Sequence, residues 1–168
     1  MYNPNIHHRK SIRLKNYDYS KPGVYFITIC TNNREQIFGE INYGEMNLNQ
    51  YGIIIEQHLT NLQNHYSYIE LDTFIIMPDH LHAIIKSNHL DERRPLSEII
   101  RGFKSFSAQQ INKMRQTNGM PFWQRNYYEH IIRNHNELNK IREYITNNPL
   151  GWDDEHRGEN NGYKSIKN

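Results

Sequence analysis

Two histidines, His80 and His82, stand two residues apart between apolar segments that are typical of β-strands. Successive side chains of a strand alternate between its faces, so both imidazoles should point the same way, with Leu81 directed to the opposite face. Imidazole is a common ligand of divalent metals, so the pair predicts a metal site; two strand histidines satisfied by neighbouring groups are the alternative. Pro78 cannot donate to a central sheet ladder, so residues 77–79 should form a bend that places the pair at a sheet margin.

A tyrosine farther along the chain could supply a nucleophile. Apolar residues recur at helical spacing over residues 138–145 and predict an amphipathic helix, which Pro149 should end because it disfavours helical geometry at the residue before it. Tyr144 and Asn148 are four residues apart and therefore share nearly one helical face. A tyrosine hydroxyl can act as a nucleophile, and the amide one turn away can orient it or assist a metal. A tyrosine that only covers the edge of the core is the alternative.

Together these side chains indicate one chemistry, which acts on a phosphodiester. A divalent cation held by His80 and His82 can polarise a phosphate oxygen and neutralise developing charge. The Tyr144 hydroxyl can then attack phosphorus, form a phosphotyrosine and expel a 3′-hydroxyl, and a later strand hydroxyl can reverse the step. No nucleoside triphosphate is needed, and the Gly-rich residues 39–44 lack the Lys and Ser/Thr pattern of a P-loop.

Several motifs of this chain resemble those of a known family. They occur in order between about residues 9 and 152, at residues 17–31, 38–40, 77–82, 100–105, 122–133 and 144–149. His80-Leu81-His82 resembles the His-hydrophobe-His motif of the IS200-type single-tyrosine transposases. The chain as a whole is similar to their domesticated branch, the REP-associated tyrosine transposases.

The resemblance implies a role for each of these side chains. By it, His80 and His82 are metal ligands, Tyr144 is the nucleophile, and the metal is Mg²⁺ or Mn²⁺. The implied partner is single-stranded DNA containing a hairpin, bound by a monomer or by a homodimer that shares active sites. One position departs from the family: IS200-type enzymes usually carry Gln four residues after the tyrosine, where this chain has the shorter Asn148. We assign Asn148 to the catalytic set and count it as a third candidate metal ligand.

Composition agrees with such an enzyme without establishing it. A chain of 168 residues is long enough for one domain with a substantial core. The net charge of +2 and the pI of about 8.6 permit nucleic-acid binding. Cys30 is the single cysteine, which excludes an intramolecular disulfide and a cysteine-based zinc site. No apolar run reaches membrane length, so we expect a cytoplasmic protein with no membrane partner.

The hydrophobic pattern predicts how these residues are positioned. Strands are expected over residues 24–31, 68–77, 81–86 and 127–133, a hairpin-like region over 37–48, and helices over 50–65, from 95 to about 117 and around Tyr144. Strands interleaved with helices favour an antiparallel α+β fold. The resemblance implies a ferredoxin-like antiparallel sheet with helices packed on one face. We expect a basic N-terminal arm over 1–16, a single catalytic domain over 17–152 and a polar C-terminal tail over 153–168.

Candidate nucleic-acid contacts fall in three groups: Arg9, Lys10 and Arg13 of the arm, Arg101 and Lys104 of the second helix, and Trp123 with Arg125 before the last strand. Arg101 and Lys104 lie three residues apart and share a helical face that could bind phosphates. Trp123 and Arg125 could stand beside unpaired bases. The alternatives are a solvated helix surface and a tryptophan that closes the core.

Other side chains compete for a place in the site. Tyr127 and Tyr128 are neighbours in a strand, so only one of them can face the histidines. His130 and Glu129 could supply a further ligand or base. We expect Asp79 to cap the bend before His80.

The sequence therefore predicts a metal-dependent single-stranded DNA nuclease and strand transferase, which cleaves at hairpin-containing sites through a phosphotyrosine. The alternative from another class is a nucleic-acid-binding module on a ferredoxin-like sheet without a cleavage role. A third possibility is a metallohydrolase that activates water with His80, His82 and a carboxylate.

Overall fold

The computed structural model describes residues 22–88 and 94–160, so the predicted arm over residues 1–16 lies outside the described residues. Its elements are β1 (Gly23–Cys30), the short 3₁₀ helix η1 (Asn32–Arg34), β2 (Gly39–Asn42), β3 (Glu45–Leu48), α1 (Gln50–His65), β4 (Ile69–Met77), β5 (His80–Ser87), α2 (Leu96–Met114), β6 (Tyr128–Ile132) and α3 (His135–Asn160). The strands and helices expected from the hydrophobic pattern are present, with bounds shifted by a few residues except at the end of α3. No helix in the described ranges is both long enough and apolar enough to cross a membrane.

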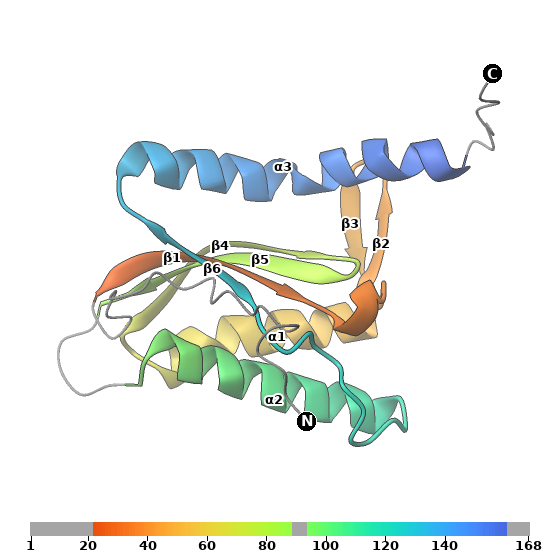
Figure 1. The fold of residues 1–168 in the computed structure, drawn as a ribbon, viewed down its shortest axis with the longest axis horizontal. Helices are drawn as coiled ribbons and strands as arrows, with labels where there is room; N and C mark the ends of the chain where they lie inside the picture. Colours follow the sequence, from red (N-terminus) through yellow and green to blue (C-terminus); the bar gives the residue numbers. More distant parts are fainter. Residues whose placement is uncertain (1–21, 89–93, 161–168) are drawn as a thin grey trace, which may run out of the picture.

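Four strands form one antiparallel sheet in the order β4-β5-β1-β6, and β2 and β3 pair separately as a hairpin (Figure 1). The succession β1–α1–β4–β5–α2–β6 with this strand order is a ferredoxin-like α+β arrangement, as expected. Met77 pairs with His80, so Pro78 and Asp79 form the tight turn between β4 and β5. The predicted bend before the histidines is therefore confirmed.

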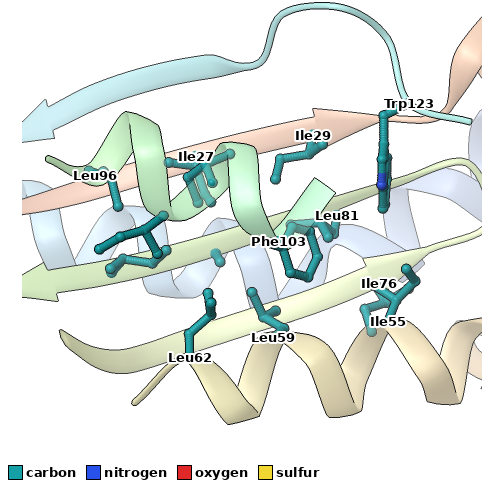
Figure 2. Packing of buried hydrophobic residues seen from close by; sticks show 14 of the residues in the cluster. Ile27, Ile29, Ile55, Leu59, Leu62, Ile76, Leu81, Leu96, Phe103 and Trp123 are labelled. Atoms are coloured by element: carbon teal, nitrogen blue, oxygen red, sulfur yellow. The ribbon is translucent and has the colours of Figure 1, made fainter. Parts of the chain in front are cut away.

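The main core fills the space between the sheet and the two helices α1 and α2 (Figure 2). Alternation along β5 sends Leu81, Ala83 and Ile85 into this core, where they are fully buried. Residues 53–62 of α1 place their buried side chains against the same face at helical spacing.

Trp123 belongs to this main core and is not available for stacking on bases. Its side chain is 7% exposed and lies against Phe38 and Phe103, with ring centroids 5.4 and 5.9 Å away. Its indole N–H donates to the hydroxyl of Ser107 at 3.1 Å. The prediction of a nucleic-acid contact at Trp123 was wrong, because the ring and its polar nitrogen are both satisfied inside the fold.

The third helix lies on the opposite face of the sheet from α1 and α2 (Figure 1). The expectation of helices on one face therefore holds for α1 and α2 only. The α3 side is covered by a small apolar cluster made of Ile84, Ile132, Leu138 and Ile145. On that side β5 continues from Ile84 to His82 and His80, so the histidines share a face with α3.

The same helix passes through Pro149 and runs to Asn160, whereas the sequence pattern predicted its end there. Contacts beyond the proline support the continuation: Leu150 lies against Gly44 at the tip of the β2–β3 hairpin, and the Trp152 ring lies 5.9 Å from that of His80. Tertiary packing here overrides the local preference. The predicted boundary of a C-terminal tail at residue 153 falls inside this helix.

Candidate active site

The two strand histidines point into one place, on the α3 side of β5. Both side chains are buried, and their Nε2 atoms are 3.1 Å apart. The predicted same-face arrangement is therefore present, and it sits next to the tight turn at the sheet margin.

Asp79 holds the ring of His80. Its Oδ1 accepts a hydrogen bond from His80 Nδ1 at 2.6 Å, and its Oδ2 pairs with Arg34 Nε at 2.8 Å. We had expected the Asp79 carboxylate to cap the turn, and it binds His80 and Arg34 instead. It fixes the ring orientation of His80 and leaves Nε2 directed at His82, as buried carboxylates do for metal-binding histidines.

His82 is held by β1, the neighbouring strand. The register pairs it with Thr28, whose hydroxyl lies 2.8 Å from His82 Nδ1, and Phe26 stacks on the ring at 5.3 Å. Burial, with smaller contributions from His80 and Arg34, lowers the pKa of His82 to about 3. The imidazole is consequently neutral at ordinary pH, which is the form that ligates metals.

The pair of rings fits a divalent cation. Asp79 and Thr28 can accept from the two Nδ1 atoms, which leaves two Nε2 lone pairs facing each other across 3.1 Å. Two lone pairs at this separation favour a positive ion between them. Adjacent ligands of an octahedral Mg²⁺ at roughly 2.1 Å stand about 3 Å apart, which matches this distance. Among the described residues no cluster of three or more His, Cys, Asp or Glu side chains could hold a metal, so any ligands beyond the two imidazoles would be amides, waters or substrate oxygens.

Tyr144 reaches this pair from α3. Its hydroxyl is 3.3 Å from His82 Nε2, and its ring packs edge-on against Phe26 at 6.2 Å. The side chain is 51% exposed, so the hydroxyl is accessible to a substrate. The fully buried Ile145 next to it fixes the helix on the sheet and so sets the direction of the phenol.

An open cleft of about 440 Å³ surrounds these groups. It is lined by Thr28, Arg34, His80, His82, Tyr144, Asn147, Asn148, Gly151 and Trp152. The two imidazoles and the phenol thus converge, and Asn148 lines the same cleft. The cleft is open to solvent beside both the imidazole pair and the phenol.

A polar clamp attaches α3 to the sheet two residues before the tyrosine. Arg142 donates from Nε and Nη2 to the two carboxylate oxygens of Asp72, at 2.7 and 2.6 Å. Lys86 Nζ also lies 2.7 Å from the Asp72 carboxylate. The Arg142 bonds, more than any other contact, hold the pKa of Asp72 well below its usual range. The carboxylate therefore stays ionised and joins β4 to α3.

The third helix begins at a side-chain cap. Asn134 Oδ1 accepts from the backbone N–H of Glu137 at 2.9 Å, and the Glu137 carboxylate accepts from the N–H of Arg133 at 2.8 Å. His130 Nε2 pairs with Glu137 Oε1 at 2.7 Å and does not line the cleft. The sequence had offered His130 as a further ligand or base, and the structure gives it a role at the start of α3 instead.

Glu129 and Tyr127 lie on the other side of β6, where the tyrosine hydroxyl donates to the carboxylate. Tyr128 faces the α3 side, with its ring 6.2 Å from Phe26, and is not among the residues that line the cleft. Tyr144 is therefore the tyrosine that meets the histidines.

The predicted phosphate-binding residues of α2 are not at the cleft, because α2 covers the opposite face of the sheet (Figure 1). Lys104 Nζ donates to the backbone carbonyls of Gln124, Arg125 and Asn126 at 2.7 to 3.4 Å, and burial lowers its pKa. Its amine is used inside the protein. Arg101 and Arg125 are exposed, and a nucleic-acid role for them stays a prediction. Arg9, Lys10 and Arg13 lie outside the described residues.

Sequence reasoning missed several residues of the site, among them Thr28, Arg34 and Asp79 in the roles described above. Thr28 could have been found from strand pairing, but the pairing itself was not readable from one sequence. Asp79 was visible as the neighbour of His80. No local signal connected Arg34 to residues almost fifty positions away.

Comparison with known proteins shows the family and the fold that this chain shares with them. The family model described as "Transposase IS200 like" matches residues 22–148. An uncharacterised protein of Haemophilus influenzae is 39% identical over 171 residues, covering 90% of this chain and 94% of that protein. A second H. influenzae protein, whose name assigns it to the REP-associated tyrosine transposases, is 27% identical over 146 residues, covering 82% and 77%. A solved REP-associated tyrosine transposase bound to a REP hairpin shares the fold, with a TM-score of 0.62 and 20% identity over 83% of this chain and 74% of that one.

Proposed function

This chain belongs to the IS200-like transposase family, and from that premise we propose that it is a metal-dependent enzyme that cleaves and rejoins single-stranded DNA beside a hairpin. The observation that carries the proposal is the convergence of Tyr144 with both imidazoles, at 3.3 Å from His82 Nε2, in one open cleft. A tyrosine that only covered the edge of the core would have no reason to direct its hydroxyl at two buried histidines.

His80 and His82 would hold the metal, Mg²⁺ or Mn²⁺, and Asn148, which lines the same cleft, would contribute an amide oxygen. When bound, this ion supplies charge stabilisation at a phosphate oxygen. The protein's own contribution is to keep both rings oriented through Asp79 and Thr28, so that no reorganisation is required during the reaction.

Tyr144 performs the covalent step in this proposal. Its oxygen forms a bond to phosphorus and the bond from phosphorus to the 3′ oxygen breaks. The phenol loses its proton and the departing 3′ oxygen gains one, so the 5′ end of the DNA is left on the tyrosine. Because one phosphoester replaces another, a strand hydroxyl can later reverse the step without a triphosphate.

The expected substrate is single-stranded DNA with a hairpin, by analogy with the REP hairpin bound in the solved relative. A hairpin is recognised by shape and phosphate contacts, and its unpaired flank exposes base edges. We propose that this takes place in the cytoplasm. The clamp between Arg142 and Asp72 places Tyr144 of one chain at the histidines of the same chain, which favours a monomer over a homodimer that shares sites.

The test is covalent capture. The full chain is incubated with Mn²⁺ and a pool of hairpin oligonucleotides with randomised stems and flanks, and products are resolved on a denaturing gel and by mass spectrometry. We expect a protein–DNA adduct on Tyr144. Tyr144→Phe should lose the adduct and keep hairpin affinity, whereas Tyr128→Phe, a tyrosine on the same sheet face outside the cleft, should react like the wild type.

Two other outcomes would select the alternatives. Hairpin binding without any adduct in the wild type indicates a binding module. Release of a free 5′-phosphate that persists in Tyr144→Phe indicates a metallohydrolase.

A further inference from the structure

Arg34 reaches the cleft through an unusual piece of backbone. It ends η1, directly after β1, and both Asn33 and Arg34 adopt left-handed conformations, with φ of 55° and 56°. Non-glycine residues adopt this region rarely because it is sterically strained, and such strain gathers at functional sites. The conformation brings the side chain of Arg34 to the cleft wall with His80 and Tyr144.

The guanidinium is held and yet open to a ligand. Nε pairs with Asp79 Oδ2 at 2.8 Å, and Nη1 donates to Cys30 Sγ at 2.8 Å. A thiol sulfur is a weak acceptor that a phosphate oxygen can replace. Within the described part of the chain, the hydrogen bonds of Arg34 use these two nitrogens and leave Nη2 for a substrate. The side chain is 48% exposed, while Asp79 is buried beneath it.

Arg34 is also the single arginine or lysine among the described residues that line the cleft. The carboxylate of Asp79 shares its charge between Arg34 and the Nδ1–H of His80. A phosphodiester that approaches Tyr144 therefore meets one permanent cation from the protein. The planar guanidinium suits two oxygens of one phosphate.

We propose that Arg34 is a further catalytic residue, which donates to the non-bridging oxygens of the scissile phosphate while Tyr144 attacks phosphorus. This rests on the proposed strand transfer and extends it to a residue that the family resemblance did not supply. The contact orients the phosphate for attack and stabilises the charge that its oxygens carry in the transition state. The guanidinium only donates hydrogen bonds, so the atoms and charges of the transfer step are unchanged.

The first test compares adduct rates in a single turnover. Arg34→Gln should slow adduct formation by about 100-fold, the usual cost of losing one such donor. Arg34→Lys keeps the charge and should recover part of the rate. Arg133→Gln, an exposed arginine at the end of β6 outside the cleft, removes the same charge and should leave the rate unchanged. Thermal melts verify that each variant folds.

The second test separates contact with the phosphate from support of His80 through Asp79. Binding is measured with EDTA present, in the Tyr144→Phe background, on one oligonucleotide carrying either the native phosphodiester or a neutral methylphosphonate at the cleavage position mapped from the wild-type adduct. A direct contact predicts that Arg34→Gln weakens binding of the charged oligonucleotide and leaves the neutral one unaffected. A purely structural role predicts equal losses on both.

The results distinguish failure of the role proposed for Arg34 from failure of the proposed strand transfer. If the wild type forms no adduct, strand transfer itself fails and the role of Arg34 fails with it. If the wild type reacts but Arg34→Gln reacts equally fast, or loses the same affinity for both oligonucleotides, only the assignment of Arg34 is overturned.

Discussion

The two faces of the sheet differ in what they bury. The face under α1 and α2 is covered by a continuous apolar core that includes Trp123 and Phe103 (Figure 2). The α3 face has a small cluster of four buried aliphatic residues, next to which lie the buried histidines, a buried aspartate and the open cleft.

This difference indicates a division of labour. Hydrophobic burial is the dominant favourable term in folding, so the α1/α2 face should provide most of the stability. The α3 face uses part of its area for polar groups that are costly to bury, and its helix carries Tyr144. Regions with few apolar contacts open at lower free energy than the core does. We therefore expect α3 to be the part of the described fold that detaches most readily.

The largest effect should come from a matched pair of core truncations, Ile99→Ala in α2 and Ile145→Ala in α3. Both isoleucines are fully buried, but on opposite faces. Truncation should lower the free energy of unfolding by about 4 kcal/mol for Ile99 and about 2 kcal/mol for Ile145, within the usual range for such changes. Urea denaturation measures both.

Adduct formation should show the opposite order. Ile145→Ala releases the helix that positions Tyr144, so its adduct rate per folded molecule should fall, whereas Ile99→Ala should keep the wild-type rate. Equal effects of the two truncations on both measurements would show that the faces behave as one unit and would end the comparison.

A smaller effect is expected from the clamp. Asp72→Asn keeps the shape of the side chain and removes the charge that holds Arg142 and Lys86. We expect a loss of roughly 2 kcal/mol, less than for a fully buried pair because Arg142 is partly exposed. Hydrogen exchange should accelerate in α3 amides and stay unchanged in α2.

Glu70→Gln serves as the control for the clamp. Glu70 pairs with the same Lys86 but is half exposed, and exposed pairs contribute little. If Glu70→Gln lowered the free energy of unfolding as much as Asp72→Asn does, the loss would come from the ion pairs along the strand edge and not from the link to α3.

The pH dependence of that clamp follows from the lowered pKa of Asp72. A carboxyl with a lower pKa in the folded state contributes stability above its unfolded pKa, about 3.9, and this contribution is lost as pH falls below that value. The stability difference between wild type and Asp72→Asn should therefore be constant near pH 6 and shrink below about pH 4. Urea titrations at several pH values measure it; a difference that stays constant into acid would exclude Asp72 as its source.

Much of this arrangement could be predicted from periodicity and spacing. The alternation around His80 and His82 gave their shared face, and the four-residue step from Tyr144 gave its relation to Asn148. Helical spacing located α1 at the residues where the structure has it, since a regular pattern over several turns is hard to mistake.

The remainder depends on tertiary contacts that one sequence does not encode locally. The apolar stripe of α3 does not indicate which face of the sheet the helix covers. The prediction therefore put all helices on one face. The continuation of α3 past Pro149 is supported by the contact of Leu150 with Gly44 and by that of Trp152 with His80. The indole N–H of the buried Trp123 is satisfied by the hydroxyl of Ser107. Each of these misjudged residues is fixed by a partner distant in sequence.

The smallest expected effect concerns the hairpin that supports the far end of α3. Tyr43 is 96% exposed and has φ of 55°, followed by Gly44 with φ of 77°, which is the pattern of a type I′ turn. Asparagine is favoured at this first turn position and tyrosine is not. Tyr43→Asn should therefore stabilise the protein by about 0.5 kcal/mol, a typical gain for an improved turn residue. Because Gly44 lies against Leu150, the gain should appear as slower hydrogen exchange in the second half of α3, with α2 unaffected.

Tyr43→Phe keeps the same backbone strain and should leave hydrogen exchange in both helices unchanged. Equal slowing in α2 and α3 would show that the hairpin supports the whole fold and not the weaker face alone.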